Sequence, residues 1–299
     1  MLKIALVLVM ALFLLGMVVE LWRSWQKSVW DGQETLYLGF QQGERLWLVK
    51  IDKSQEEIMM GEIAPNLVLT LARGFGEQQA RNIYKRGEME KISGIKMIKE
   101  SLTWTFGLPV KGVVWLPESK ESLNLSLSLS KSLFGVGKTN LTGWDLLRLL
   151  WLTKSLRFDQ IVVFSFADLT GALKQVRPDG VEVIILDPER VDSWIAQRLA
   201  SRELVNETCT WEVNNATTHL GLAAQVARLL HNTGVQVAII GKAEKSQSGI
   251  YLGKETDCQA PDYFSRFLNL PLIKEKGSGS HSEITVVLGE DFWWNCCSR

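Results

Sequence analysis

The first hydrophobic pattern along the chain is a continuous apolar block near its start. Residues 4–19 contain no charged side chain, and Leu21 and Trp22 extend the block past Glu20. A helix on the surface of a globular protein would have a polar face, and this block has none. Sixteen residues at about 1.5 Å each give about 24 Å, so only with its flanking residues does the block approach the roughly 30 Å of a bilayer core. The pattern predicts one transmembrane helix, a signal anchor over residues 1–24.

The residues that follow the block favour an anchor over a cleaved signal peptide. A cleaved peptide ends in small residues, whereas this chain reads GMVVELW at 16–22. The tryptophans at 22, 25 and 30 are typical of an aromatic belt at a membrane surface. Positive charges flank the block almost equally, so charge does not fix its orientation, and we expect the rest of the chain to be extracytoplasmic.

Beyond residue 33, short strand-like runs alternate with amphipathic helical runs, which is typical of an α/β protein. Residues 122–133 alternate leucine with serine or asparagine, and this two-residue period predicts a half-buried strand. Thr142 and Asp145 form a capping-box pattern at the start of a helix, and Asp187 followed by Pro188 opens another. Further strands are predicted at 35–40, 45–52, 110–116, 160–166 and 181–186, and a further helix at 92–106.

The last ninety residues follow a compact βαββαβ order. Strands are predicted at 209–214, 235–240, 250–252 and 284–288, and helices at 220–231 and 261–268. This order predicts a small α+β, ferredoxin-like domain. The polar segment 202–207 is a domain boundary, so we expect a mixed α/β domain over 25–203, the α+β domain over 204–293 and a tail over 294–299.

Composition narrows the function classes. The chain has 33 basic and 33 acidic residues and is 46% hydrophobic, so it is not predominantly disordered. A zero net charge without a long basic run argues against a nucleic-acid partner. Three histidines and four cysteines do not have the spacing of a metal site, and no set of catalytic residues stands out, so we predict no metal ligands and no catalytic residue.

Two other motifs leave alternatives open. Cys209 lies at the start of the first strand of the α+β domain, and Cys258 lies just past the third. In a ferredoxin-like sheet these two strands would be antiparallel neighbours, which permits a disulfide. Two unpaired thiols fit the sequence equally. Cys296 and Cys297 belong to the tail. The run GVGKT at 135–139 ends like a phosphate-binding loop, but Ser132 stands where that loop requires glycine.

The C-terminal block resembles the C-terminal domain of LytR-CpsA-Psr proteins over residues 207–292. The resemblance rests on several motifs in order: WEVNNAT at 211–217, GLAAQVA at 221–227, TGVQV at 233–237, IYL at 250–252 and ITVVLGEDF at 284–292. The preceding half is similar to landmarks of the family's catalytic domain. These are LYLG at 36–39, LVKID at 48–52, IAP at 63–65 and FGLPVKGVV at 106–114.

The resemblance implies an anchored protein that acts on anionic glycopolymers. Members of the family transfer such polymers from a polyprenyl pyrophosphate carrier to peptidoglycan with the help of Mg²⁺. Where the family has an Arg-Asp pair after its Ile-Pro, this chain has Pro65-Asn66-Leu67, so the guanidinium for the pyrophosphate and the carboxylate for the metal are missing. Contacts to phosphate or glycopolymer are expected from the basic residues Arg45, Arg81, Lys85 and Arg86, with ordinary solvated surface charge as the other interpretation.

These observations predict a membrane-anchored cell-envelope protein that binds the cell wall or an anionic glycopolymer without catalysis and without a cofactor. Its partners would be the membrane and peptidoglycan, glycopolymer or polyprenyl carrier. One alternative is an active glycopolymer phosphotransferase, which would require Mg²⁺. The other is a regulator that faces the cytoplasm.

Overall fold

The computed structural model describes residues 22–118, 124–244, 247–253, 258–274 and 283–296, together with Gly16 and Val19. Most of the predicted transmembrane segment, and Cys297 in the tail, lie outside these residues. Among the helices of the described part, none is both long enough and apolar enough to cross a bilayer.

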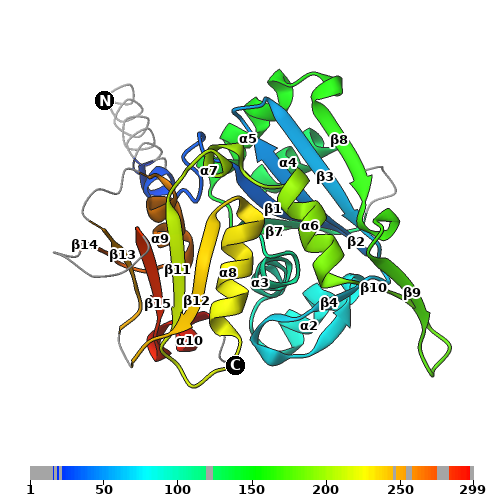
Figure 1. Ribbon diagram of the computed structural model, residues 1–299. Helices are drawn as coiled ribbons and strands as arrows, with labels where there is room; N and C mark the ends of the chain where they lie inside the picture. The colour runs from blue at the N-terminus through cyan, green and yellow to red at the C-terminus, as the bar shows by residue number, and fades with distance from the viewer. Residues whose placement is uncertain are drawn as a thin grey trace, which may run out of the picture.

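A mixed six-stranded sheet forms the centre of the first domain (Figure 1), in the order β7-β6-β1-β2-β3-β8. The strand β1 is parallel to β6 and antiparallel to β2, and β3 is parallel to β8. The sheet consists of β1 (Leu36–Gln42), β2 (Arg45–Asp52), β3 (Glu57–Ile63), β6 (Val110–Leu116), β7 (Lys138–Thr139) and β8 (Ile161–Ser165). Two hairpins lie beside it, β4 (Val68–Thr70) with β5 (Glu77–Gln79), and β9 (Ala172–Val176) with β10 (Glu182–Leu186).

The inner strands β1 and β2 are buried on both faces; successive side chains of a strand point to opposite faces, so each strand contributes to two cores. Tyr37 and Leu46 belong to one hydrophobic cluster, whereas Leu38 and Trp47 belong to another. The first cluster packs against α3 (Gly94–Phe106) and α6 (Pro188–Arg198), and the second against α4 (Leu125–Leu133) and α5 (Gly143–Ser155). The result is a three-layer α/β/α domain. Its shorter helices are η1 (Ala72–Gly74), η2 (Ala80–Asn82), α2 (Ile83–Met89), η3 (Phe158–Gln160), η4 (Phe166–Asp168) and α7 (Arg202–Val205).

The predicted strand at 122–133 is wrong, because residues 125–133 form the helix α4. The side chain of Asn124 accepts a hydrogen bond from the backbone N–H of Leu127 and caps the helix. Leu125 and Leu129 are buried, whereas Leu127 is 42% exposed. A Leu-Ser repeat places leucines at i and i+4 as well as at i and i+2, so the helix buries one leucine face and the repeat alone does not select a strand.

The C-terminal domain has a five-stranded sheet in the order β12-β11-β15-β13-β14. Its strand β11 (Thr210–Asn215) is parallel to both neighbours, β12 (Gln236–Lys242) and β15 (Ile284–Leu288). The predicted ferredoxin-like topology is therefore wrong, since that fold would place β13 (Gly249–Leu252) beside β11. The remaining elements are α8 (Leu222–Thr233), α9 (Ala260–Leu268), β14 (Leu272–Lys274) and α10 (Glu290–Cys296), which extends into the predicted tail.

The predicted helix boundaries agree with the structure at their capping residues. Thr142 and Asp145 form the reciprocal capping box, and the Asp187 side chain accepts from the N–H groups of Glu189 and Arg190 at the start of α6. Gly107 and Gly234 end α3 and α8 in the left-handed conformation that favours glycine.

One arginine joins the two domains. Arg228 of α8 forms two hydrogen bonds with Asp192 of α6, at 2.5 and 2.7 Å. It also donates to the carbonyls of Trp104 and Thr105 at the end of α3, both at 2.7 Å. A cation at free carbonyls is favourable at a helix C-terminus, so this side chain holds α8 against α3. Figure 1 shows the two helices side by side.

Candidate functional site

The strands β1, β3, β6 and β8 all end at the same edge of the central sheet, because their pairings make them mutually parallel in direction. In open α/β sheets, ligands bind outside this carboxyl edge. The turns and helices that follow these strands carry the basic residues singled out from the sequence. This edge is therefore the first candidate binding site.

Arg45 and Arg81 lie on either side of the turn that follows β3. The register pairs Leu46 with Ile63, which puts Arg45 opposite the beginning of the turn. The backbone N–H of Arg81 donates to the Pro65 carbonyl at 3.2 Å. Both arginine side chains are exposed, and Arg81 Nε donates to Gln79 Oε1 at 3.0 Å. The fold thus brings two guanidinium groups from separate segments to one side of the sheet.

Asn66 holds this turn in place. Its side-chain amide donates to the Glu182 carbonyl at 3.3 Å, and its own carbonyl accepts from the Ile184 N–H at 3.2 Å. The next residue, Leu67, is fully buried and accepts from the Ala80 N–H at 2.8 Å. The position where the family pattern has an arginine is therefore occupied by a neutral side chain whose amide is bonded to β10.

The other two predicted binding residues, Lys85 and Arg86, differ in how free they are to contact a phosphate. Lys85 lies exposed on α2. Arg86 forms an ion pair with Glu90 one turn later, at 2.6 Å. The Glu90 carboxylate already pairs with Arg86, so Arg86 is less available to a phosphate than the exposed Lys85.

Lys138 of the GVGKT run faces the same edge. It lies 5.5 Å from the centre of the Tyr84 ring and 3.7 Å from Glu88. Tyr84 in turn stacks on Trp115, with 4.4 Å between ring centres. The run does not form a phosphate-binding loop, because its Lys138 and Thr139 belong to the edge strand β7, whereas the Lys and Ser/Thr of such a loop stand at the start of a helix.

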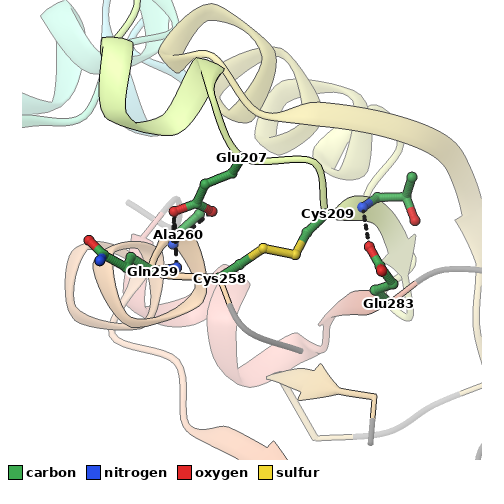
Figure 2. Close-up of a disulfide and its surroundings, with 7 residues drawn as sticks. Glu207, Cys209, Cys258, Gln259, Ala260 and Glu283 are labelled. Atoms are coloured by element: carbon green, nitrogen blue, oxygen red, sulfur yellow. Dashed lines mark hydrogen bonds between the residues drawn. A yellow bond between two sulfur atoms is a disulfide. The ribbon is translucent and has the colours of Figure 1, made fainter. Parts of the chain in front are cut away.

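The structure contains the cysteine pairing that the sequence left open. Cys209 and Cys258 form a disulfide across 49 residues, with Cα atoms 6.6 Å apart. Figure 2 shows Glu207 beside it, accepting from the N–H groups of Gln259 and Ala260 at 2.9 and 3.2 Å. The disulfide and Glu207 together fix the start of α9. The strands β11 and β13 are separated by β15, so the pairing does not depend on their being neighbours.

The described residues at the carboxyl edge do not include the usual set of metal ligands. Within the described residues, no group of three or more acidic, histidine or cysteine side chains is arranged to hold a metal ion. Near the turn, Glu88 is committed to the Gly94 N–H at 2.8 Å. That hydrogen bond, with the charge of Lys138, lowers the pKa of the Glu88 carboxyl.

Sequence reasoning missed a second basic cluster at the opposite edge of the sheet. A cavity of about 700 Å³ there is lined by Lys99, Lys111, Arg148 and Arg266. These residues come from α3, β6, α5 and α9, so no local motif joins them. Of these four residues, only Lys99 could have been noticed in the sequence. It lies four residues after Ile95 and three before Leu102, so it is a charged residue on the apolar stripe of α3.

Comparisons with known proteins give one family model and several solved structures. Residues 209–292 match the family model described as LytR cell envelope-related transcriptional attenuator. No curated protein matches the chain. Similar solved structures include TagT of B. subtilis, at 14% identity and a TM-score of 0.41, covering 55% of this chain and 89% of that one.

Two further structures show the same degree of similarity. A LytR-CPS2A-psr family protein, YwtF (TagT) with bound octaprenyl pyrophosphate lipid, has 14% identity and a TM-score of 0.40, covering 54% of this chain and 88% of that one. A transcriptional regulator from Enterococcus faecalis has 10% identity and a TM-score of 0.41, covering 68% and 88%. The most specific of these findings is the family-model match, which is confined to residues 209–292.

Proposed function

We propose that this chain is a cell-envelope protein, anchored in the membrane by its N-terminal apolar segment, that binds an anionic glycopolymer without transferring it. The binding site is the carboxyl edge of the central sheet. The observation that carries the proposal is the placement of Arg45 and Arg81 on either side of the Ala64-Pro65 turn. A planar guanidinium can contact phosphate through two donors.

The chemistry of the turn supports binding rather than catalysis. Phosphoryl transfer requires a carboxylate to position Mg²⁺ or an equivalent electrophile. Asn66 stands at the family's arginine position and its amide is engaged by the Glu182 carbonyl, whereas Leu67, at the acid's position, is buried. A neutral amide and a leucine supply neither group.

The location outside the cytoplasm is supported by the Cys209–Cys258 disulfide. Disulfides persist in oxidising compartments and are rare in the cytosol. An N-terminal anchor would then leave both domains on the outer side of the membrane. Peptide mapping of the membrane-bound protein, with and without reductant, tests this step: free thiols at both positions would contradict it.

Binding is tested with poly(glycerol phosphate) as the probe and the full chain in detergent. We expect Arg81→Ala to weaken binding about tenfold, the effect of one lost charged hydrogen bond. Arg157→Ala is the matched control, because Arg157 is 80% exposed and precedes β8, away from the carboxyl edge. Equal affinities for the two variants would overturn the assignment of the site.

Catalysis is tested separately with Mg²⁺ and a polyprenyl pyrophosphate. We expect no phosphate release above the buffer rate. Release that disappears in Arg81→Ala would replace this proposal with the phosphotransferase alternative.

A further inference from the structure

The cavity at the amino ends of β1 and β6 is bounded by both domains and by the N-terminal segment. Its walls come from residues 25–31, α3, α5, β6 and α9. Figure 1 shows the blue ribbon that begins at residue 22 next to α9, and residues of both segments line the cavity. A volume of about 700 Å³ is within the range of small-molecule sites.

Basic side chains outnumber acidic ones around the cavity. Glu34 is shared by Lys111, at 2.7 Å, and by Arg266. Arg148 donates to the Trp30 carbonyl at 2.5 Å. Asp31 is the acidic residue among the lining side chains. The two carboxylates do not balance the positive charge, so the cavity favours an anion.

Lys99 is the residue that most clearly indicates an anion-binding site. Among the residues that the structure describes, its ammonium has no hydrogen-bond or ion-pair partner, although Glu100 is the next residue. Glu100 is engaged by Arg73 through two hydrogen bonds, at 2.7 and 3.0 Å. Burial lowers the pKa of Lys99 and of Lys111. A bound anion would supply Lys99 with the countercharge that it lacks, whereas Lys111 already has Glu34.

Apolar side chains lie next to the basic residues of the cavity. Trp25, Val29 and Phe267 line the cavity. A second cleft of about 280 Å³ shares Lys99 and Phe267 with it and continues along α3 and α9. This cleft is lined mainly by Thr103, Trp104, Leu268 and Phe292. The combined site thus has a basic end and an apolar extension.

We propose that this site binds an anionic membrane lipid, with its phosphate at Lys99, Lys111, Arg148 and Arg266 and its hydrocarbon chain in the cleft between α3 and α9. A free anion would not use the apolar extension, and an uncharged lipid would leave Lys99 without a countercharge. Trp22 and Trp25, at 57% and 54% exposed, directly follow the apolar block 4–19. Exposed tryptophans are favoured at the membrane surface, which is where such a lipid would be met.

This inference is independent of the proposed function, because the site lies at the opposite edge of the sheet from Arg81. The test uses the full chain in an uncharged detergent and dihexanoyl phosphatidic acid as the probe, with binding followed by calorimetry. Inorganic phosphate and dihexanoyl phosphatidylcholine are the comparison ligands. Lys99→Met is the informative variant, since it removes no internal contact and should leave the unfolding free energy unchanged or higher. Lys96→Met is the matched control, on the same helix and 50% exposed.

We expect one phosphatidic acid per chain and an affinity about tenfold lower or more in Lys99→Met, the effect of one charged hydrogen bond. Lys96→Met and Arg81→Ala should bind as the unmodified chain does. Inorganic phosphate binding as tightly as phosphatidic acid would show a free-anion site and overturn the lipid assignment. Phosphatidylcholine binding equally well, or an unchanged affinity in Lys99→Met, would overturn the role of the basic cluster.

Discussion

Ser28 and Asp145 are 117 residues apart in the sequence, and the hydroxyl of Ser28 donates to Asp145 Oδ1 at 2.5 Å. The same carboxylate accepts from the N–H groups of Val29 and Trp30, both at 3.3 Å. Asp145 is fully buried and also completes the capping box of α5. One carboxylate therefore caps a helix and fixes the segment that connects the N-terminal apolar block to the folded domain.

Replacing Ser28 with alanine should loosen this connection. The variant loses a hydrogen bond to a charged acceptor, which contributes about 1.5–3 kcal/mol to the free energy of unfolding. Limited trypsin digestion reports the local effect, because Arg23 and Lys27 flank the segment, and cleavage after Lys27 should accelerate. Ser155→Ala is the control, since its exposed hydroxyl donates only to the Leu152 carbonyl of its own helix. Equal cleavage rates in both variants would contradict the anchoring role.

Arg228→Met should destabilise the junction between the domains by about 2–3 kcal/mol. The change leaves two α3 carbonyls without their Arg228 donor and the Asp192 carboxylate with the Asn232 amide but no cation beside it, and a partly buried carboxylate that loses its cation is costly. Arg190→Met is the matched control, because the Arg190–Asp187 pair has its arginine side chain 64% exposed and such pairs contribute about 0–1 kcal/mol. Urea unfolding compares the two. A similar loss in both variants would show that Arg228 is not the principal tie.

The sequence predicts elements well where apolar runs are bounded by turns. The observed β2, β6 and β15 have the predicted bounds. The strand β3 was missed because its sequence, EIMMGEI, has no clear period and contains Gly61. That glycine is explained only by the fold: a Cβ there would meet the Phe166 ring at 2.4 Å.

The candidate site could be predicted only in part, because its geometry also depends on the fold. Arg45 and Arg81 were expected from the sequence, but the ion pair between Arg86 and Glu90 depends on helix register. The basic cavity depends on four elements meeting in space. The sequence pattern also could not predict the strand order of the C-terminal sheet, since one βαββαβ succession of elements is compatible with more than one arrangement of strands.

The Cys209–Cys258 disulfide should contribute about 4 kcal/mol to stability, the value expected when a cross-link closes a loop of this length in the unfolded chain. The sequence separation of 49 residues sets the loop. A double Cys209→Ser, Cys258→Ser variant should lose this amount in urea unfolding, and reductant should lower the stability of the unmodified chain to the same level. A loss below about 1 kcal/mol would contradict the loop argument. Because the bond fixes the start of α9, lipid binding at the α3–α9 cleft should weaken as well.

Alkaline pH should reveal the burial of Tyr37. Its hydroxyl donates to the Leu199 carbonyl at 2.5 Å, and burial, with a smaller effect of the Asp52 charge, raises its pKa far above the ordinary value of 10.0. Above pH 10 the unfolded chain releases this proton and the folded chain keeps it, so the unfolded state binds fewer protons and stability falls as pH rises. Lys99 and Lys111 act in the opposite direction, because their lowered pKa values make stability rise with pH up to about 10.5.

Comparison with Tyr37→Phe isolates the tyrosine from these lysines. At pH 8 the variant should be about 1 kcal/mol less stable, for the lost hydrogen bond. Above pH 10 its disadvantage should shrink by up to about 1.4 kcal/mol per pH unit and then reverse, because the variant has no phenol to ionise on unfolding. Urea unfolding of both proteins from pH 8 to 11 measures the difference. A difference that stays constant over this range would show that the Tyr37 hydroxyl ionises equally in the folded and unfolded chains, and would contradict its burial against Leu199.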